Sequence, residues 1–179
     1  LLATSDLLTL KPIIFAANMD EDGVADYENN AYYQTVLAIA EKENAQVLPI
    51  CAKIEQEIGE LPAEEKEIFL EELGMAESGL DRLIKCSYSL LGLISFLTGG
   101  ADECRAWTTS RHATAPEAAG VIHTDLQKGF IRAEVVAYDD LMELGSMTEV
   151  KAKGKHRLEG KDYLVKDGDI LNIRFNVSK

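Results

Sequence analysis

The sequence predicts an α/β unit with parallel strands, followed by a compact α+β domain. Two short apolar runs, residues 12–17 and 46–51, flank one amphipathic helical segment, which gives the order strand, helix, strand. After residue 92 the pattern changes to short strands mixed with short helices that do not alternate strictly. The charge changes too, because residues 1–100 carry 18 acidic and 6 basic side chains, whereas residues 101–179 carry 13 and 12. We therefore expect two domains, 1–92 and 93–179.

The first domain starts with the continuous apolar run at 12–17, which is typical of a strand buried on both faces. The polar segment 18–23 is expected to be a loop at the carboxyl end of that strand. A helix is expected over 29–44, where apolar side chains recur at helical spacing, and a second buried strand over 46–51. Such a βαβ unit has parallel strands, and ligands bind beyond their carboxyl ends.

Residues 53–92 are expected to be helical and acidic. One helix begins near Pro62, with glutamates in its first turn, and ends at Gly74. A further helix begins near Ser78. Its apolar side chains recur at three- and four-residue spacing, which indicates a packed face made of Leu80, Leu83, Ile84, Tyr88 and Leu91.

The second domain is expected to contain short strands, short helices and one tight turn. The turn, 166–169, lies between two of the strands. Trp107 and Phe130 are expected in its core. The predicted strands are 94–98, 104–109, 130–137, 162–165 and 170–177, and the predicted helices are 115–119, 124–128 and 138–144.

Composition excludes several classes of protein. No apolar run approaches the roughly 20 residues of a membrane span, and the N-terminus has no signal-peptide pattern, so we expect a cytoplasmic protein that does not contact a membrane. Cys51, Cys86 and Cys104 are widely spaced, which predicts reduced thiols rather than a disulfide framework or a zinc site. The net charge of −13 resides almost entirely in the first 100 residues, which argues against an RNA-binding surface there.

The loop after the first strand carries the first candidate site, an Asn-x-x-Glu pattern formed by Asn18, Met19 and Glu21. GTP-binding domains place Asn-Lys-x-Asp in such a loop, where the acidic side chain pairs with the donors of guanine. Glu is one methylene longer than Asp, and Met lacks the charge of Lys, so the pattern predicts weaker guanine selectivity and a tolerance or preference for adenine. The alternative is an exposed polar loop, with Asp20 and Asp22 as solvated charges or a helix cap.

The loop after the second strand carries Cys51, Ala52 and Lys53. GTP-binding proteins place a Ser-Ala-Lys-like loop here, whose backbone N–H meets the base from the other side. Taken singly, Cys51 is equally explained as a buried core thiol and Lys53 as an exposed lysine at a helix start. Together, the two loops on adjacent strands of one βαβ unit predict a nucleotide-base site.

Several longer segments resemble the YchF/Obg-like ATPase family, in order and over almost the whole chain. The segments are VLPICAKIE (47–55), FLEELG (69–74), ESGLDRLI (77–84), RAWT (105–108), APEAAGVIHTD (115–125), GFIRAEVV (129–136), EGKDY (159–163) and FNV (175–177).

The resemblance implies the fold and the activity. Residues 1–92 would be the C-terminal half of a P-loop nucleotide-binding domain, with 1–11 as the tail of a helical insertion, and 93–179 an α+β β-grasp, ubiquitin-like TGS domain. The family implies a cytoplasmic, translation-associated ATPase that prefers ATP to GTP and contacts the ribosome or its RNA. We expect a monomer.

The sequence departs from the family in what it lacks. No G-x-x-x-x-G-K-[ST] occurs in it, so the loop and the lysine that hold nucleotide phosphates are absent. The residues that would bind Mg²⁺ are absent too. The sequence also begins without Met, and we expect a C-terminal portion that is inactive alone and contains no catalytic residue and no metal ligand.

Two further patterns in the second domain bear on function. His123 and Asp125 flank Thr124, and we expect Thr124 or Asp125 to cap a short helix, with His123 fixing the turn, rather than to catalyse a reaction. The densest basic stretch, 151–157, is either a solvated loop or a contact to RNA phosphates made by Lys151, Lys153, Lys155 and Arg157. The second explanation leads to an alternative function, a non-enzymatic TGS module that binds RNA or protein.

Overall fold

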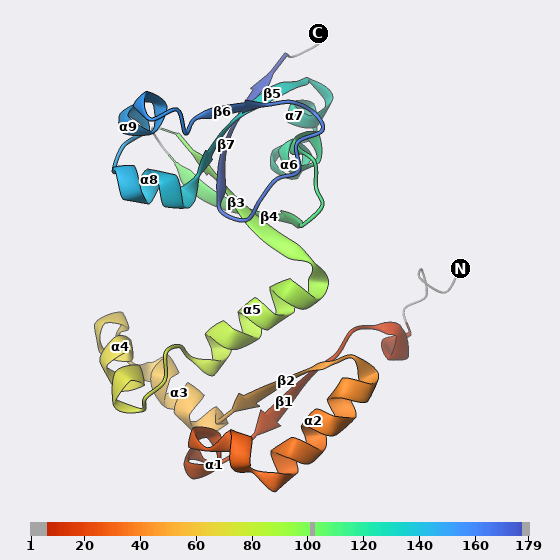
Figure 1. Cartoon of the computed structure of the whole chain (residues 1–179), viewed down its shortest axis with the longest axis vertical. Helices are drawn as coiled ribbons and strands as arrows, with labels where there is room; N and C mark the ends of the chain where they lie inside the picture. Colours follow the sequence, from red (N-terminus) through yellow and green to blue (C-terminus); the bar gives the residue numbers. More distant parts are fainter. Residues whose placement is uncertain (1–6, 101–102, 177–179) are drawn as a thin grey trace. The chain divides into compact units, whose positions relative to one another are not determined.

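A computed structural model describes residues 7–100 and 103–176. The chain divides into two compact units, Leu1–Leu91 and Gly92–Lys179 (Figure 1). Within the described ranges, none of the helices combines the length and the apolar character that crossing a membrane requires. The expected tail 1–11 is described only from residue 7 onward, where Leu8–Leu10 form a single 3-10 turn.

The first unit contains the predicted order strand, helix, strand, which is confirmed. Strand β1 (Ile14–Asn18) pairs in parallel with β2 (Gln46–Ile50), and α2 (Ala31–Glu43) lies between them in the chain. The side chain of Asn30 starts α2 by accepting hydrogen bonds from two backbone N–H groups, and Asn44 ends it in a left-handed conformation.

The segment expected to be a loop over 18–23 differs from the prediction, because a short helix, α1 (Glu21–Ala25), begins within it. Asp20 Oδ1 accepts a hydrogen bond from the N–H of Gly23 at 2.8 Å, and this side-chain cap starts the helix. Asp20 is therefore a helix cap, which was one of the two roles considered for it, and Glu21 is the first helical residue.

Three helices follow β2: α3 (Ala52–Glu60), α4 (Ala63–Glu72) and α5 (Gly79–Leu91). Cys51 and Ile54 are buried together with Val24 and Ile58 in the core of this unit. Glu55 joins α3 to α5, because its carboxylate accepts hydrogen bonds from two N–H groups in the first turn of α5.

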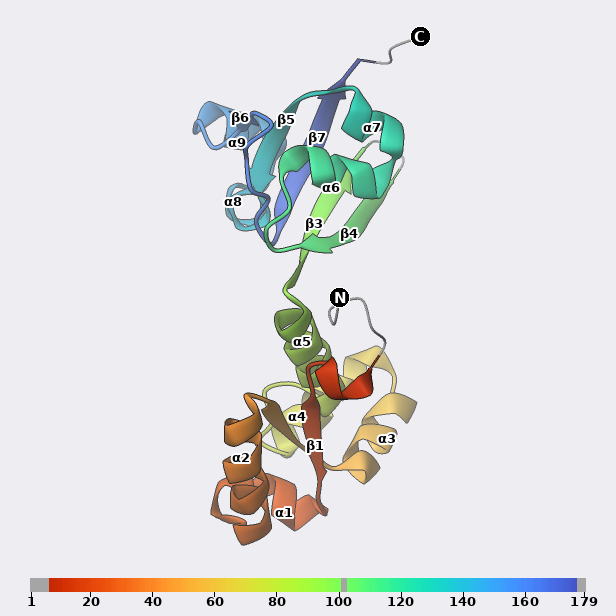
Figure 2. The same ribbon diagram turned by 90° about the vertical axis from the view of Figure 1, so that its right-hand side faces the viewer.

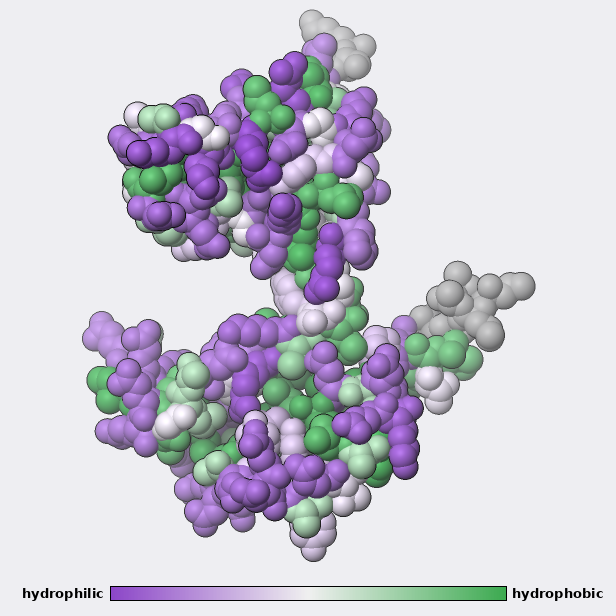
Figure 3. All heavy atoms as spheres, in the orientation of Figure 1, coloured by the Kyte–Doolittle hydropathy of each residue, from purple (hydrophilic) through white to green (hydrophobic). Residues whose placement is uncertain are grey.

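The apolar face expected to pack on α5 is largely exposed. Its members Leu80, Leu83, Ile84 and Leu91 each expose 38% or more of their surface, so the expectation of a packed face is not met within the described residues. Hydrophobic side chains also reach the surface elsewhere on both units, next to strongly hydrophilic ones (Figure 3).

The second unit is built on a mixed five-stranded sheet in the order β4-β3-β7-β5-β6 (Figure 2). Strands β3 and β7 are parallel, and the other neighbouring pairs are antiparallel. The strands are β3 (Leu93–Gly99), β4 (Cys104–Ser110), β5 (Phe130–Ala137), β6 (Arg157–Glu159) and β7 (Asp169–Phe175). The helices are α6 (Ala115–Ile122), α7 (Thr124–Lys128), α8 (Tyr138–Leu144) and α9 (Met147–Ala152).

Helix α6 lies across one face of this sheet (Figure 2). Its alanines Ala115, Ala118 and Ala119 are fully buried, and their small side chains let the helix approach the strands closely. Phe96 is fully buried opposite them, and Phe130 is also in this core, as the sequence predicts. Trp107 is half-buried and packs against the same cluster.

One predicted strand of the second unit was wrong, and two elements of that unit were not predicted. No strand forms over 162–165, where a single bridge pairs Thr114 with Leu164. Strand β6 forms instead over 157–159 and pairs with β5, and helix α9 was not expected at all. Backbone bonds to Ala113 and Ala115 hold Val165 and Tyr163, and Asp169 accepts hydrogen bonds from the Tyr163 hydroxyl and the N–H of Lys166, so the segment has partners without a strand ladder. Of the predicted strand 170–177, residue 177 lies outside the described residues.

Candidate nucleotide-base site

The two loops that the sequence singles out lie side by side at the carboxyl ends of β1 and β2. The strand register pairs Asn18 with Ile50, so the parallel strands end at the same level. Asn18 Oδ1 accepts a hydrogen bond from the N–H of Ala52 at 3.0 Å, and the N–H of Met19 donates to the carbonyl of Ile50 at 2.9 Å. These two bonds tie the first loop to the second across the sheet.

A solvent-open hollow of about 470 Å³ lies between these loops. All six residues of the predicted base site line it, namely Asn18, Met19, Glu21, Cys51, Ala52 and Lys53, and so do Asp20 and Asp22. A larger hollow, of about 650 Å³, lies among α3, α4 and α5, and polar side chains such as Glu55, Ser78 and Asp81 line part of it.

An ion pair joins the two loops at this hollow. Lys53 Nζ lies 2.6 Å from Glu21 Oε1, with both side chains more than half exposed. The hydrogen bond and the negative charge of Glu21 raise the pKa of Lys53 above its ordinary value. Among the described residues, no hydrogen bond or ion pair engages the second oxygen, Glu21 Oε2.

Cys51 and Ala52 line the hollow, but the contacts that the structure gives them stabilise the fold. Cys51 is 4% exposed and packs into the core of the first unit, as the core-thiol alternative predicts. It begins α3 without a side-chain cap. The N–H of Ala52 is already donated to Asn18, so the polar side chains that line the hollow are those of Asn18, Asp20, Glu21, Asp22 and Lys53.

Of the candidate residues His123, Thr124 and Asp125, only His123 caps a helix with its side chain. His123 Nδ1 accepts a hydrogen bond from the N–H of Asp125 at 3.1 Å and starts α7. The expectation that Thr124 or Asp125 makes the cap is therefore wrong, because the imidazole nitrogen of the preceding residue takes this place. Where residues are described, no group of three His, Cys, Asp or Glu side chains is placed to hold a metal ion.

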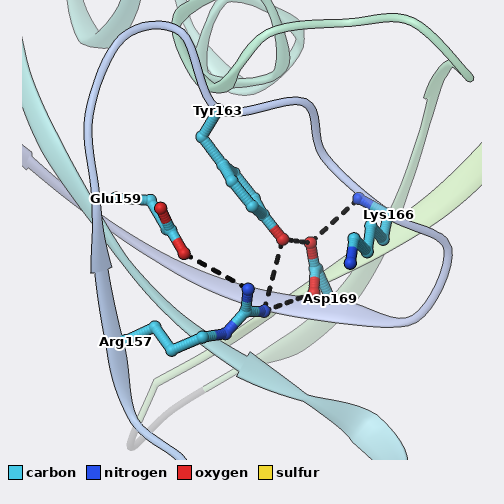
Figure 4. A network of polar contacts seen from close by, with 5 residues as sticks. All are labelled: Arg157, Glu159, Tyr163, Lys166 and Asp169. Carbon is cyan, nitrogen blue, oxygen red and sulfur yellow. Dashed lines mark hydrogen bonds and ion pairs between the residues drawn. The ribbon is translucent and has the colours of Figure 1, made fainter.

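The basic stretch of the second unit is only partly available to a partner. Lys151 lies in the last turn of α9, and Lys153 ends that helix. Lys155 Nζ pairs with Asp140 Oδ1 at 3.2 Å. Arg157 takes part in a polar network (Figure 4). The four residues predicted to contact RNA therefore differ in their availability, because Lys155 and Arg157 already have acidic partners.

That network is the main polar cluster that sequence analysis missed. Asp169 is only 2% exposed and accepts hydrogen bonds from the hydroxyl of Tyr163 at 2.7 Å and from the N–H of Lys166 at 2.9 Å (Figure 4). Arg157 donates to the same Tyr163 hydroxyl and pairs with Asp169 and Glu159. Burial, together with the bond to Asp169, raises the pKa of Tyr163 to about 12. A local sign of it in the sequence is the acidic residue Asp169 at the start of β7.

Comparisons with known proteins cover both units. A family model named YchF-GTPase_C, described as "Protein of unknown function (DUF933)", matches residues 93–176. The ribosome-binding ATPase YchF of Bacillus subtilis is 57% identical over 171 residues, which are 96% of this chain and 47% of the relative. Obg-like ATPase 1 of Oryza sativa is 40% identical over 178 residues, 99% of this chain and 45% of the relative. The chain spans about half the length of the curated relatives it matches.

Two solved structures are similar in fold to this chain. The structure of the Schizosaccharomyces pombe YchF GTPase matches with a TM-score of 0.82 and 32% identity, over 94% of this chain and 44% of that one. A GTP binding protein from Pyrococcus horikoshii matches with a TM-score of 0.61 and 21% identity, over 93% of this chain and 46% of that one, which shows a likeness of fold alone.

Proposed function

Because this chain belongs to the YchF/Obg-like ATPase family and corresponds to the C-terminal portion of its members, we propose that the complete protein is a ribosome-associated, cytoplasmic enzyme that hydrolyses ATP, and GTP less well. The relative in Bacillus subtilis is named a ribosome-binding ATPase, and the Schizosaccharomyces pombe structure is described as a GTPase. In this proposal the first unit recognises the base of the nucleotide, and the second unit makes the contact with the ribosome.

The observation that carries the proposal is the hydrogen bond from the N–H of Ala52 to Asn18 Oδ1. It holds two loops together at the carboxyl ends of parallel strands, which is where ligands bind in such sheets. The hollow between the loops presents the amide of Asn18, the carboxylate of Glu21 and the ammonium of Lys53. A purine base needs such a mixture of donors and acceptors, so the residues present fit the base of ATP.

The phosphates and Mg²⁺ would be held by residues outside this sequence. No G-x-x-x-x-G-K-[ST] occurs in the 179 residues. Because backbone N–H groups and the lysine of that loop supply much of the binding to phosphates, we expect this chain alone to bind nucleotide weakly and to hydrolyse none. When bound, Mg²⁺ would neutralise the developing negative charge on the phosphates.

We propose that the second unit is a TGS domain of the β-grasp class. The support is its sheet order, β4-β3-β7-β5-β6, with the two central strands parallel and α6 following the first hairpin. Ribosomal RNA phosphates would meet Lys151 and Lys153 first, because Lys155 and Arg157 already have acidic partners. The complete protein would be a monomer.

Calorimetry with ATP and GTP tests the proposal. We would titrate each nucleotide, with Mg²⁺, into this chain and into the chain extended upstream by the residues that its relatives have. The extended chain should bind ATP more tightly than GTP, and this chain alone should bind both weakly. Tight, selective GTP binding by the extended chain would contradict the proposed base preference. If the extended chain bound neither nucleotide, the proposed enzymatic function would be contradicted.

The second candidate function is a binding module without enzymatic activity. Lys151, in the last turn of α9, and Lys153, directly after that helix, form no ion pair within the described part of the chain, and this observation favours contact with an anionic partner. If the extended chain bound no nucleotide but sedimented with ribosomes, this second function would replace the first.

A further inference from the structure

The ion pair with Lys53 engages one of the two carboxylate oxygens of Glu21, the acidic residue expected to face the base. Lys53 Nζ lies 2.6 Å from Glu21 Oε1. The other oxygen, Oε2, forms no hydrogen bond with any residue that the structure describes. Glu21 therefore offers a ligand one free acceptor oxygen, and the ammonium beside it offers donors.

Both ends of this pair are held by the fold around them. Glu21 opens α1, whose start is fixed by the bond between Asp20 and Gly23. Lys53 lies in the first turn of α3, and Ile54 anchors that turn in the core. The backbone at Lys53 is further fixed by the preceding N–H of Ala52, which is bonded to Asn18. The backbone on both sides of the ion pair is therefore fixed at the start of a helix.

The pairing edges of the two purines differ in the number of adjacent donors. Guanine presents a ring N–H next to an amino group, two donors that suit the two oxygens of a free carboxylate. Adenine presents one amino donor next to a ring nitrogen that accepts. A carboxylate with one oxygen already bonded to an ammonium offers one acceptor next to one donor, which suits adenine.

We propose that Lys53 is a specificity-determining residue, which disfavours guanine by occupying one oxygen of Glu21 through their ion pair. The inference rests on the proposed nucleotide site and adds to it. The length of Glu21 alone would weaken guanine binding, but its carboxylate could still accept two donors. With Lys53 bound, Glu21 can accept only one of the two adjacent donors of guanine, and a polar group that loses its partner in a binding site lowers affinity.

The test is to measure the ratio of the ATP and GTP dissociation constants in variants of the complete protein by calorimetry. Lys53→Ala should improve GTP binding relative to ATP, so that the preference for ATP falls on the order of fivefold. Lys53→Arg, which keeps the charge, should retain most of the preference. The matched control is Lys42→Ala, which removes an exposed lysine from the last turn of α2 and should leave the ratio unchanged.

A double-mutant comparison tests whether Lys53 acts through Glu21. In a Glu21→Ala background, Lys53→Ala should no longer change the ratio, because there is no carboxylate left to occupy. The inference would be overturned if Lys53→Ala left the ratio unchanged or weakened the binding of ATP and GTP equally. The proposed function would still stand in that case, provided that the wild-type protein binds ATP. A wild-type protein that bound neither nucleotide would overturn both. Circular dichroism of each variant would show that the fold is kept.

Discussion

Asn18 accepts a hydrogen bond from the backbone N–H of Ala52, which lies 34 residues further along the chain. The bond connects the ends of two parallel strands, and it makes one surface out of two loops that the sequence presents separately. Neither loop by itself offers both the acceptors and the charged donor proposed to bind the base. The amide of Asn18 and the carboxylate of Glu21 come from the first loop, and the ammonium of Lys53 comes from the second.

Removing this link should weaken nucleotide binding without unfolding the first unit. Asn18→Ala deletes the acceptor and leaves the N–H of Ala52 without its partner. We expect this to cost about 1–2 kcal/mol of binding free energy, which raises the ATP dissociation constant of the extended protein roughly tenfold. Calorimetry measures it. The control is Gln56→Ala, because the amide of Gln56 bonds only within the exposed surface of α3, to Glu60. Equal effects of the two substitutions would contradict a special role for Asn18.

The link between α3 and α5 should stabilise the first unit. Glu55 accepts hydrogen bonds from the N–H of Gly79 at 2.7 Å and of Leu80 at 3.1 Å, and so caps α5. Glu55→Ala should lower the free energy of unfolding of this unit by about 1–2 kcal/mol in a urea titration. Glu41→Ala, an exposed glutamate of α2, is the matched control and should change it little.

Gly79→Ala tests the same contact from the other side. A Cβ atom at Gly79 would meet Glu55 Oε1 at 2.7 Å, so the carboxylate must move away from the start of α5. We expect a destabilisation similar to that of Glu55→Ala, and no further loss when the two substitutions are combined, because both remove the same cap. Additive losses would show that Gly79 matters for another reason.

The polar network of the second unit should stabilise it through the hydroxyl of Tyr163. Tyr163→Phe removes the donor to the buried Asp169 and should lower the free energy of unfolding by about 1–3 kcal/mol, because that carboxylate loses a partner. Chemical denaturation of the chain measures this loss. Tyr32→Phe is the control, since Tyr32 is 86% exposed.

The same tyrosine predicts a loss of stability in strong alkali. Its pKa is raised from 10.0 to about 12 in the folded chain by burial and by Asp169. A group whose pKa is higher in the folded state stabilises the protein fully below its unfolded pKa and loses this contribution as pH rises through the folded pKa. The free energy of unfolding should therefore fall between pH 10 and 12, and it should fall less in Tyr163→Phe. An identical pH dependence in both proteins would contradict this assignment.

The contact with the ribosome is tested on the basic residues of α9. Replacing Lys151 and Lys153 with Glu should reduce the fraction of the chain that sediments with ribosomes several-fold, and the remaining binding should depend less steeply on salt. The control, Lys42→Glu, makes a lysine-to-glutamate change on the first unit and should have little effect. Equal losses in both variants would indicate a nonspecific charge effect.

Local patterns in the sequence determined most of the secondary structure. Strand β5 and helices α7 and α8 have the bounds that the sequence predicts, because alternation, caps and helical spacing act within a few residues. The two loops of the base site could also be identified, since each directly follows a buried strand and parallel strands end on the same side of a sheet.

The tertiary structure alone decided which polar groups meet. The pairing of Lys53 with Glu21 spans 32 residues, and the bond between Ser95 and Asp167 spans 72, so no local spacing indicates them. The same applies to the segment 162–165, whose backbone bonds to Ala113 and Ala115, about 50 residues earlier in the chain, and not to a neighbouring strand of the sheet. Helix and strand preferences depend on near neighbours. Ion pairs and buried hydrogen bonds depend on distances that exist only after the chain has folded.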